Sequence, residues 1–481
     1  MRLPVTTKLI RCFLLLFLIT SLKTLYAQYY PHNDSIDYLE NYRGQYHFSP
    51  RSEWMNDING LVYQGGKYHM IYQWGKKIRH GGYATSPDLL HWKDEGVALI
   101  PQKSFLPSDA VRNVSGDQVY SGSAVVVSDN MAKRITGSKK EAIVAIYTGT
   151  AEGTCLAWSN DYGTTWHDYA NNPVANSTKG ADPRDPCVIW HDPTSKWVMA
   201  LYEKGTTFYG SADLINWKFL SNLNFGFECP DIFQLPLDRD VNNKKWVLQD
   251  ANGSYLIGNF DGTSFIKDEG QDTLLMDVGP DFYAAQTFPM DNLPNNDTRI
   301  IQIAWMDHWN GGIGEKIWER NATFPVSLEI VTYNGQKRLT RNPIAEIFSI
   351  YENTKNWNSQ LLNINTNLLS EIKSKKFDLT VEVDLTKTSA TMFGFKIANK
   401  TILYDITNKT LLSKELLPDT SNHIVVRILV DWGQLEVFAN NGIYSYSEQF
   451  AFTPDRNDIE LFTDGAITLV SMEFHEIART W

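Results

Sequence analysis

Three acidic residues stand in contexts that suit acid–base chemistry on a sugar. They are Asp57, Asp185 and Glu228, in the segments 54–60, 182–186 and 225–231. A retaining glycosidase needs two carboxyl groups about 5–5.5 Å apart, one to attack the anomeric carbon and one to protonate the leaving oxygen. The sequence therefore predicts glycoside hydrolysis, provided that the fold brings these acids together.

The neighbours of Glu228 along the chain are apolar. They are Phe225, Phe227, Cys229 and Pro230. Apolar surroundings disfavour the charged form of a carboxyl group and raise its pKa, which a general acid requires. We therefore expect Glu228 to be the acid/base.

The other two acids have polar neighbours. Asp57 lies close to Asn56 and Asn59, whose amides can hydrogen-bond an anion, so we expect Asp57 to be the nucleophile. Asp185 follows Arg184, which is expected to keep it ionised. A fixed carboxylate there can bind sugar hydroxyls more tightly as the ring approaches an oxocarbenium-like state, so Asp185 is expected to stabilise the transition state.

Each acidic segment alone is more typical of a turn than of a site, because Asp and Asn beside Gly often form turns. The combination is more specific, since each segment precedes a strand-like run. These runs are Gly60–Tyr63, Cys187–Trp190 and Ile232–Leu235. If they are the innermost strands of successive propeller blades, the acids converge at one end of a central funnel.

Short runs rich in β-branched and aromatic residues dominate the first two thirds of the chain. Further examples are Tyr68–Gln73, Ala142–Tyr147, Trp197–Tyr202, Trp246–Gln249 and Ile300–Trp305. Between such runs a Ser–Asp–Trp element recurs, in 86–92, 211–217 and more loosely 159–166, with 261–265 as a degenerate fourth copy. A repeated strand–turn–strand unit predicts a β-propeller.

The pattern changes near residue 343. Asn342 and Pro343 suit the start of a helix, and Ile344, Ile347, Phe348 and Tyr351 have helical spacing. A polar stretch follows, and strand-like alternation then returns in 377–385, 391–397, 423–430, 435–438 and 459–462, which favours a β-sandwich. The predicted fold is all-β, with a propeller at 28–342, a helical and polar linker at 343–376 and a sandwich at 377–481.

Composition narrows the functional classes. The 481-residue chain carries 44 Lys+Arg against 55 Asp+Glu, a formal net charge of -11, which argues against nucleic acid as a partner. Residues 1–27 resemble a signal peptide, with a basic start, an apolar core and Ala27 at the cleavage position. The mature protein is therefore expected to be secreted or periplasmic, without membrane insertion. Its three cysteines have neither zinc-site nor disulfide spacing.

Together these motifs resemble glycoside hydrolase family 32, the invertase, levanase and inulinase family. Trp54–Gly60, Arg184-Asp185-Pro186 and Glu228-Cys229 match its three acidic motifs, in the family's order. The resemblance implies a five-bladed propeller and a sandwich, no metal or organic cofactor, and release of terminal fructose from sucrose or fructans. The residues expected to bind substrate are Trp54, Asn56, Gln73, Trp74, Tyr120, Ser121, Arg184 and Tyr283.

Two departures from the family pattern bear on specificity. Ile58 replaces the usual Pro, which is expected to loosen the loop after the nucleophile. The segment Gln73–Gly82 is shorter than usual and lacks an Asn-Pro and a Trp-Gly pair, and Trp74 either replaces part of the missing wall or packs within a blade. Sucrose or polymer, β-2,1 or β-2,6 linkage, and oligomeric state therefore stay open. The alternatives are an endo-acting fructanase and a fructan-binding protein that has lost catalysis.

Overall fold

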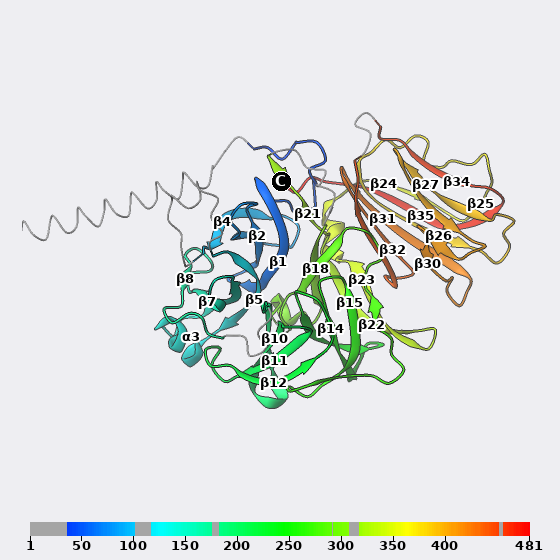
Figure 1. Cartoon of the computed structure of the whole chain (residues 1–481). Helices are drawn as coiled ribbons and strands as arrows, with labels where there is room; N and C mark the ends of the chain where they lie inside the picture. Colours follow the sequence, from blue (N-terminus) through cyan, green and yellow to red (C-terminus); the bar gives the residue numbers. More distant parts are fainter. Residues whose placement is uncertain (1–35, 102–116, 176–181, 291, 307–316, 452–455) are drawn as a thin grey trace, which may run out of the picture. The chain divides into compact units, whose positions relative to one another are not determined.

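The computed structural model describes residues 36–101, 117–175, 182–290, 292–306, 317–451 and 456–481. The expected signal peptide lies outside these residues. Within them the chain is built almost wholly of strands, with one α-helix, α3 (Asp129–Thr136), and short 3₁₀ helices (Figure 1). The predicted all-β class is confirmed. None of the helices in these ranges has the length and apolarity that crossing a membrane would take.

Strands β1 to β16 form four groups of four, and within each group the strands pair in chain order. The groups are β1 (Glu53–Gln64), β2 (Lys67–Trp74), β3 (His80–Ser86) and β4 (Lys93–Leu99); β5 (Val119–Val127), β6 (Ala142–Gly149), β7 (Gly153–Ser159) and β8 (His167–Asp168); β9 (Arg184–His191), β10 (Lys196–Tyr202), β11 (Thr206–Ser211) and β12 (Lys218–Leu223); and β13 (Asp231–Leu237), β14 (Asp240–Gln249), β15 (Ser254–Phe260) and β16 (Phe265–Lys267). The first strands lie beside one another, β1 against β5 and β5 against β9.

A fifth set joins the edge of the fourth group, because β22 pairs with β13. Its strands are β18 (Phe282–Thr287), β19 (Ile300–Met306), β22 (Val326–Tyr333) and β23 (Gln336–Pro343). The short strands that complete these sheets are β17 (Leu274–Leu275), β20 (Trp318–Glu319) and β21 (Asn321–Ala322). The strands predicted in this part of the chain all fall within observed strands.

The recurring Ser–Asp–Trp element forms the same turn in its copies at 86–92 and 211–217. In the first copy Asp88 accepts the backbone N–H groups of Leu90 and His91, at 3.0 and 2.8 Å, and the indole of Trp92 donates to the Leu89 carbonyl. The copy at 211–217 repeats each of these bonds. All four copies join the third and fourth strands of their groups. The sequence repeat therefore marks structurally equivalent positions.

The first strand of a sheet often carries an irregularity at its beginning. In β1 the register shifts between Met55 and Ile58, and in β5 it shifts at Ser121. In β9 the shift falls between Arg184 and Cys187, and in β18 it falls between Tyr283 and Gln286. A β-bulge bends its strand and re-aims a side chain. These bulges lie where the predicted site residues lie.

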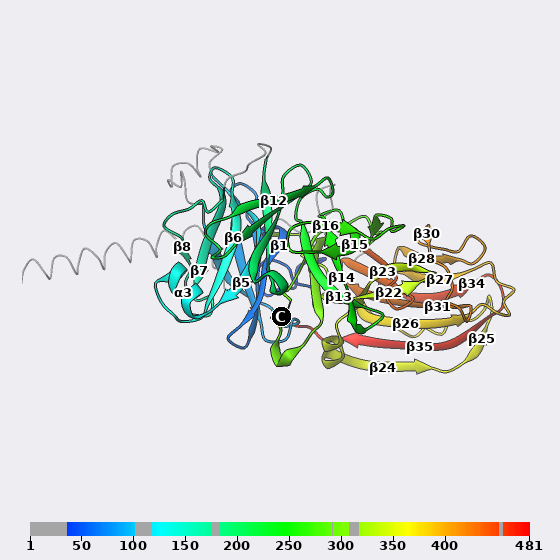
Figure 2. The same ribbon diagram turned by 90° about the horizontal axis from the view of Figure 1, so that it is seen from below.

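The last third of the chain forms two further sheets that share one hydrophobic core, and Figure 2 shows them as layers. One sheet holds β24 (Tyr351–Trp357), β25 (Gln360–Leu362), β26 (Lys376–Asp384), β31 (His423–Asp431), β32 (Gln434–Ala439), β33 (Tyr444–Gln449) and β35 (Ile467–Ile477). The other holds β27 (Met392–Ile397), β28 (Lys400–Asp405), β29 (Thr410–Leu411), β30 (Lys414–Glu415) and β34 (Ile459–Thr463).

The expected helical linker differs from what the structure shows. The segment Ala345–Ile350 is a 3₁₀ helix that begins after Ile344 rather than at Pro343. Ile344, Ile347 and Ile350 are buried at the three-residue spacing of a 3₁₀ helix, while Phe348 is exposed. The polar stretch beyond it is not a free connector, because β24 and β25 both pair with β35.

A buried histidine ties the N-terminal segment to the C-terminal sheet. The ring of His47 lies between Asp431, at 3.0 Å, and Glu436, at 2.7 Å, and none of the three side chains is exposed. Burial lowers the pKa of His47, but the hydrogen bonds to the two carboxylates outweigh burial and raise the pKa to about 9. Asp431 also accepts the backbone N–H groups of Gln45, Tyr46 and His47.

This arrangement predicts a pH-dependent contribution to stability. Because the folded-state pKa of His47 lies above its unfolded value, the contribution is complete below about pH 6.5 and is lost as the pH rises through 9. His47→Gln is expected to cost about 3 kcal/mol of unfolding free energy at pH 6, and much less near pH 9.5. Denaturant unfolding at both pH values tests this, with exposed His91→Gln as the control. An equal cost at both pH values would contradict it.

Candidate active site

Asp57 is the centre of a buried hydrogen-bond cluster. Its Oδ2 accepts the hydroxyl of Ser121 at 2.7 Å, the side-chain amide of Gln73 at 3.0 Å and the thiol of Cys229 at 3.4 Å. Gln73 also donates to Ser121 at 2.7 Å, so both are fixed in place. Burial and the charge of Glu228 raise the pKa of Asp57, and the donations from Ser121 and Cys229 oppose the rise.

The donors to this carboxylate differ from those expected. Asn59 donates to the backbone carbonyl of Asp57 rather than to its side chain. Asn56 keeps a buried Oδ1 without a hydrogen-bond partner among the described residues. A buried unpaired acceptor is costly, so this oxygen is suited to a donor from a bound molecule. The interactions that hold Asp57 come instead from β2, β5 and the segment before β13.

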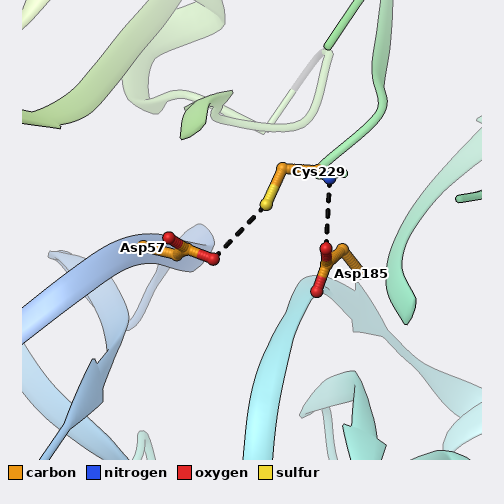
Figure 3. A group of neighbouring side chains, drawn as sticks. All are labelled: Asp57, Asp185 and Cys229. Carbon is orange, nitrogen blue, oxygen red and sulfur yellow. Dashed lines mark hydrogen bonds between the residues drawn. The ribbon is translucent and has the colours of Figure 1, made fainter. Parts of the chain in front are cut away.

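Asp185 lies on the other side of Cys229, and Figure 3 shows the three residues together. The backbone N–H of Cys229 donates to Asp185 Oδ2 at 3.2 Å, while the backbone N–H of Asp185 donates to Thr148. Burial and the charge on Asp57 raise the pKa of Asp185 to about 8. Arg184 influences Asp185 less than predicted, because it approaches only to 3.8 Å and its charge lowers the Asp185 pKa less than burial and Asp57 raise it.

Arg184 binds Glu228 instead. Its Nη2 and Nε donate to Glu228 Oε1 at 2.8 and 3.1 Å, and the hydroxyl of Tyr283 donates to Oε2 at 2.7 Å. The expected apolar enclosure of Glu228 is not present, since Phe227 is 44% exposed and stacks under Arg184 with Tyr202. Glu228 is thus held by one cation and one hydroxyl, and burial together with this bond raises the pKa of Tyr283.

Three of the same residues have unusual backbone conformations. Asp185, Glu228 and Cys229 have φ angles of 61°, 55° and 38°, in the left-handed region that non-glycine residues rarely occupy. Such conformations cost of order 1–3 kcal/mol each and persist where the surroundings impose them. At Cys229 the strain aims the N–H at Asp185 and the thiol at Asp57, so one residue bridges two acids from different strands.

Arginines and aromatic rings alternate beside the acids. The guanidinium of Arg79 lies over the rings of Trp54 and Tyr120, at 5.0 and 5.2 Å, and Arg320 lies over Trp54 and Trp305. Arg79 comes from the short Gln73–Gly82 segment. The sequence carried no signal for Arg320, because no recognisable motif surrounds it.

Two expectations about the same region are corrected. Trp74 is buried, pairs with Met55 in the sheet and donates its indole N–H to the Ser52 carbonyl, so it packs within the sheet rather than facing a ligand. Ile58 lies in β1, paired with Tyr72 and fully buried, so no loosened loop follows Asp57. The structure brings together Asp57, Asp185, Glu228, Gln73, Ser121, Arg184 and Tyr283, and it places Trp54 and Tyr120 beside Arg79.

The donor set fits a metal ion poorly. Ligand atoms of Asp57, Asp185 and Cys229 lie within 4.8 Å of one another. However, burial raises the pKa of the Cys229 thiol well above its ordinary value, whereas a metal ligand must be a thiolate. Asp57 Oδ2 is also already occupied by three donors.

Carboxyl groups gather where the first strands begin, and an arginine, a tyrosine and amide and hydroxyl donors hold them. This arrangement is typical of a glycoside hydrolase. Family comparison agrees with this class. The model described as "Glycosyl hydrolases family 32 N-terminal domain" matches residues 47–343, and that of the C-terminal domain matches 346–476. The chain belongs to glycoside hydrolase family 32.

Individual relatives cover nearly the whole chain. A levanase of Bacillus subtilis is 32% identical over 93% of this chain and 72% of its own length, and an extracellular exo-inulinase of Aspergillus niger is 30% identical over 93% and 96%. Among solved structures, exo-inulinase from Aspergillus awamori superposes with a TM-score of 0.81 at 27% identity, covering 92% of this chain and 100% of that one. The protein is therefore a family 32 enzyme.

The raised pKa of Asp185 predicts a stabilising substitution. Its folded pKa of about 8 lies above the unfolded value near 3.8, so ionisation costs stability increasingly as the pH rises between these values. Asp185→Asn keeps the acceptor for Cys229 and removes the charge. The gain in unfolding free energy is expected to be at least about 1 kcal/mol larger near pH 8 than near pH 4.5.

Urea unfolding at the two pH values measures this difference, and Asp272→Asn, at an exposed position, serves as the control. A stability gain at Asp185 that does not change with pH would contradict a buried titration.

Proposed function

We propose that the protein is a retaining, exo-acting β-fructosidase that releases terminal fructosyl units from sucrose or fructans. The observation that carries the mechanism is the buried Asp57, fixed by three donors and close enough to Glu228 for its charge to raise the Asp57 pKa. The substrate class rests on relatives named levanase and exo-inulinase.

In the first step, a carboxylate oxygen of Asp57 attacks the anomeric carbon of the fructosyl unit. The bond to the leaving oxygen breaks, and Glu228 gives that oxygen its proton. The three hydrogen bonds end on Oδ2 of Asp57, so we assign the attack to Oδ1. In the second step, water attacks the same carbon, returns a proton to Glu228 and releases Asp57.

Asp185 and Asn56 are assigned to the sugar. A sugar hydroxyl bound to Asp185 meets a buried carboxyl group, and such bonds strengthen as positive charge develops on the ring. The unpaired Oδ1 of Asn56 supplies an acceptor for a second hydroxyl. Arg184 and Tyr283 hold Glu228 in position, and Trp54 and Tyr120 with Arg79 form a wall.

We also propose the finer architecture and location. Four equivalent groups of strands, joined at the same turn, plus a fifth set support a five-bladed propeller at 28–342, followed by a β-sandwich that takes in the strands from β24 onward. Extracellular relatives and the leader-like N-terminus support export from the cell. No metal or organic cofactor enters the proposed mechanism.

An endo-acting fructanase is a second candidate, because only residues 75–79 connect β2 to β3, where the family pattern is longer. The products decide between the two. Purified protein incubated with sucrose, inulin and levan is expected to release free fructose from the first time point. Asp57→Ala is expected to lower the rate at least about 10⁴-fold, since it removes the nucleophile.

Early oligosaccharides from the polymers would replace the exo assignment by the endo one. No product from any fructoside, with circular dichroism showing folded protein, would overturn the fructosidase proposal.

Ser121 gives a sharper test of the nucleophile. Its hydroxyl lowers the pKa of Asp57, so Ser121→Ala is expected to raise that pKa further. The nucleophile must be ionised, so the acidic limb of kcat/KM against pH should move to higher pH, with a loss of about 10-fold or more at the optimum. Ser123→Ala is the matched control, because Ser123 lies on the same strand but accepts the Val188 N–H. An unshifted acidic limb in Ser121→Ala would remove Asp57 from the role.

A further inference from the structure

A groove of about 610 Å³ opens at the far end of β9 from the acids. Trp190 lies five residues beyond Asp185, which corresponds to roughly 16 Å along an extended strand. The side chains of its wall that matter here are Trp190, His191, Asp192, Trp197, Trp246 and Asp261. The mechanism proposed above uses none of them.

Trp190 presents an exposed but fixed aromatic face. The side chain is 41% exposed, yet its indole N–H donates to Asp192 at 3.3 Å and its ring meets Trp197 edge-on at 5.1 Å. A ring with a fixed orientation loses little entropy on binding. A flat ring of this kind suits the apolar C–H face of a sugar.

Two exposed carboxylates stand beside the ring. Asp261 accepts the backbone N–H groups of Ser264 and Thr263 at 2.8 and 2.7 Å, and the Ser264 bond is the main cause that lowers its pKa. Its turn is packed against His191, since a Cβ on Gly262 would come within 2.5 Å of the His191 ring. The turn at Asp261 and the end of β9 at His191 are thus in contact. The carboxylate oxygens of Asp192 and Asp261 can accept hydrogen bonds from hydroxyl groups.

The indole N–H of Trp197, in the same wall, is buried and has no hydrogen-bond partner among the described residues. The Trp197 ring packs into the hydrophobic core with Val188, Met199 and Leu201. The ring that meets Trp190 edge-on is therefore itself fixed in place.

We propose that this groove is a second carbohydrate-binding site, which holds a stretch of fructan polymer away from the active site. Sugar rings stack on Trp190, and their hydroxyl groups donate hydrogen bonds to Asp192 and Asp261. The negative charge of the wall favours a neutral, hydroxyl-rich chain over an anionic ligand. The nature of the polymer rests on the function proposed above; the site itself rests on the groove.

Binding is tested in a variant that cannot consume the polymer. In native gels containing inulin or levan, Asp57→Ala protein is expected to be retarded, and adding Trp190→Ala should weaken the apparent affinity about fivefold or more. Phe219→Ala is the matched control, because Phe219 is 47% exposed and lies on β12 outside the groove. In the active enzyme, Trp190→Ala should raise KM for polymer severalfold and leave kcat/KM for sucrose unchanged.

Equal retardation of the Trp190 and Phe219 variants, or an unchanged KM for polymer, would overturn the second site while leaving the fructosidase proposal intact. A matching loss on sucrose would also overturn it, because the substitution would then act through the active site. If wild type cleaves no fructoside, the proposed function fails, and a Trp190-dependent retardation would still support the groove as a binding site.

Discussion

The structure is organised around the burial of like-charged groups in one place. Asp57 and Asp185 are both almost fully buried, and their ligand atoms lie within 4.8 Å together with the thiol of Cys229. Burial and mutual repulsion both oppose ionisation. The cluster persists because donors arrive from β2, β5 and the segment before β13, and because Arg184 places its charge on Glu228 nearby. The beginnings of β1, β5 and β9 must therefore lie close together.

The bulges make this convergence possible. A regular strand sends alternate side chains to opposite faces, so a residue aimed along the strand axis needs an extra residue in the ladder. Such an irregularity falls at Asp57, Ser121, Asp185 and just after Tyr283. The positive φ of Asp185, Glu228 and Cys229 belongs to the same adjustment. The fold thus tolerates local strain at one end of its strands, while the buried strand interiors keep regular pairing.

The parts of this arrangement that depend on neighbours in the chain could be predicted from the sequence. Strand alternation and the Ser–Asp–Trp turn are set by residues two to six positions apart, and both were predicted at the right places. The motifs also predicted that Asp57, Asp185 and Glu228 would meet. Their partners could not be read in the same way. Asn56 and Asn59 are adjacent to Asp57 in the chain, but its donors are Gln73, Ser121 and Cys229. Neighbours along the chain predict the surroundings of a side chain only when its contacts are local. The hydrogen-bond partners of Glu228 lie 44 and 55 positions away in the sequence.

The C-terminal sheet also reaches this site, through the segment that precedes β18. The backbone N–H groups of Val278 and Asp281 donate to the carbonyls of Ser445 and Ser447, and Asp277 accepts the side chains of Ser445, Ser447 and Arg341. Gly279 passes so close to Ser447 that a Cβ would come within 2.2 Å of its backbone. The chain leaves this contact at Asp281 and reaches Tyr283, the donor to Glu228, two residues later. The path along the chain from the contact with β33 to the partner of Glu228 is therefore very short, and the same sheet holds the segment before β1 through His47 and Asp431. Polar bonds to the C-terminal sheet thus hold both the segment before β1 and the segment before β18.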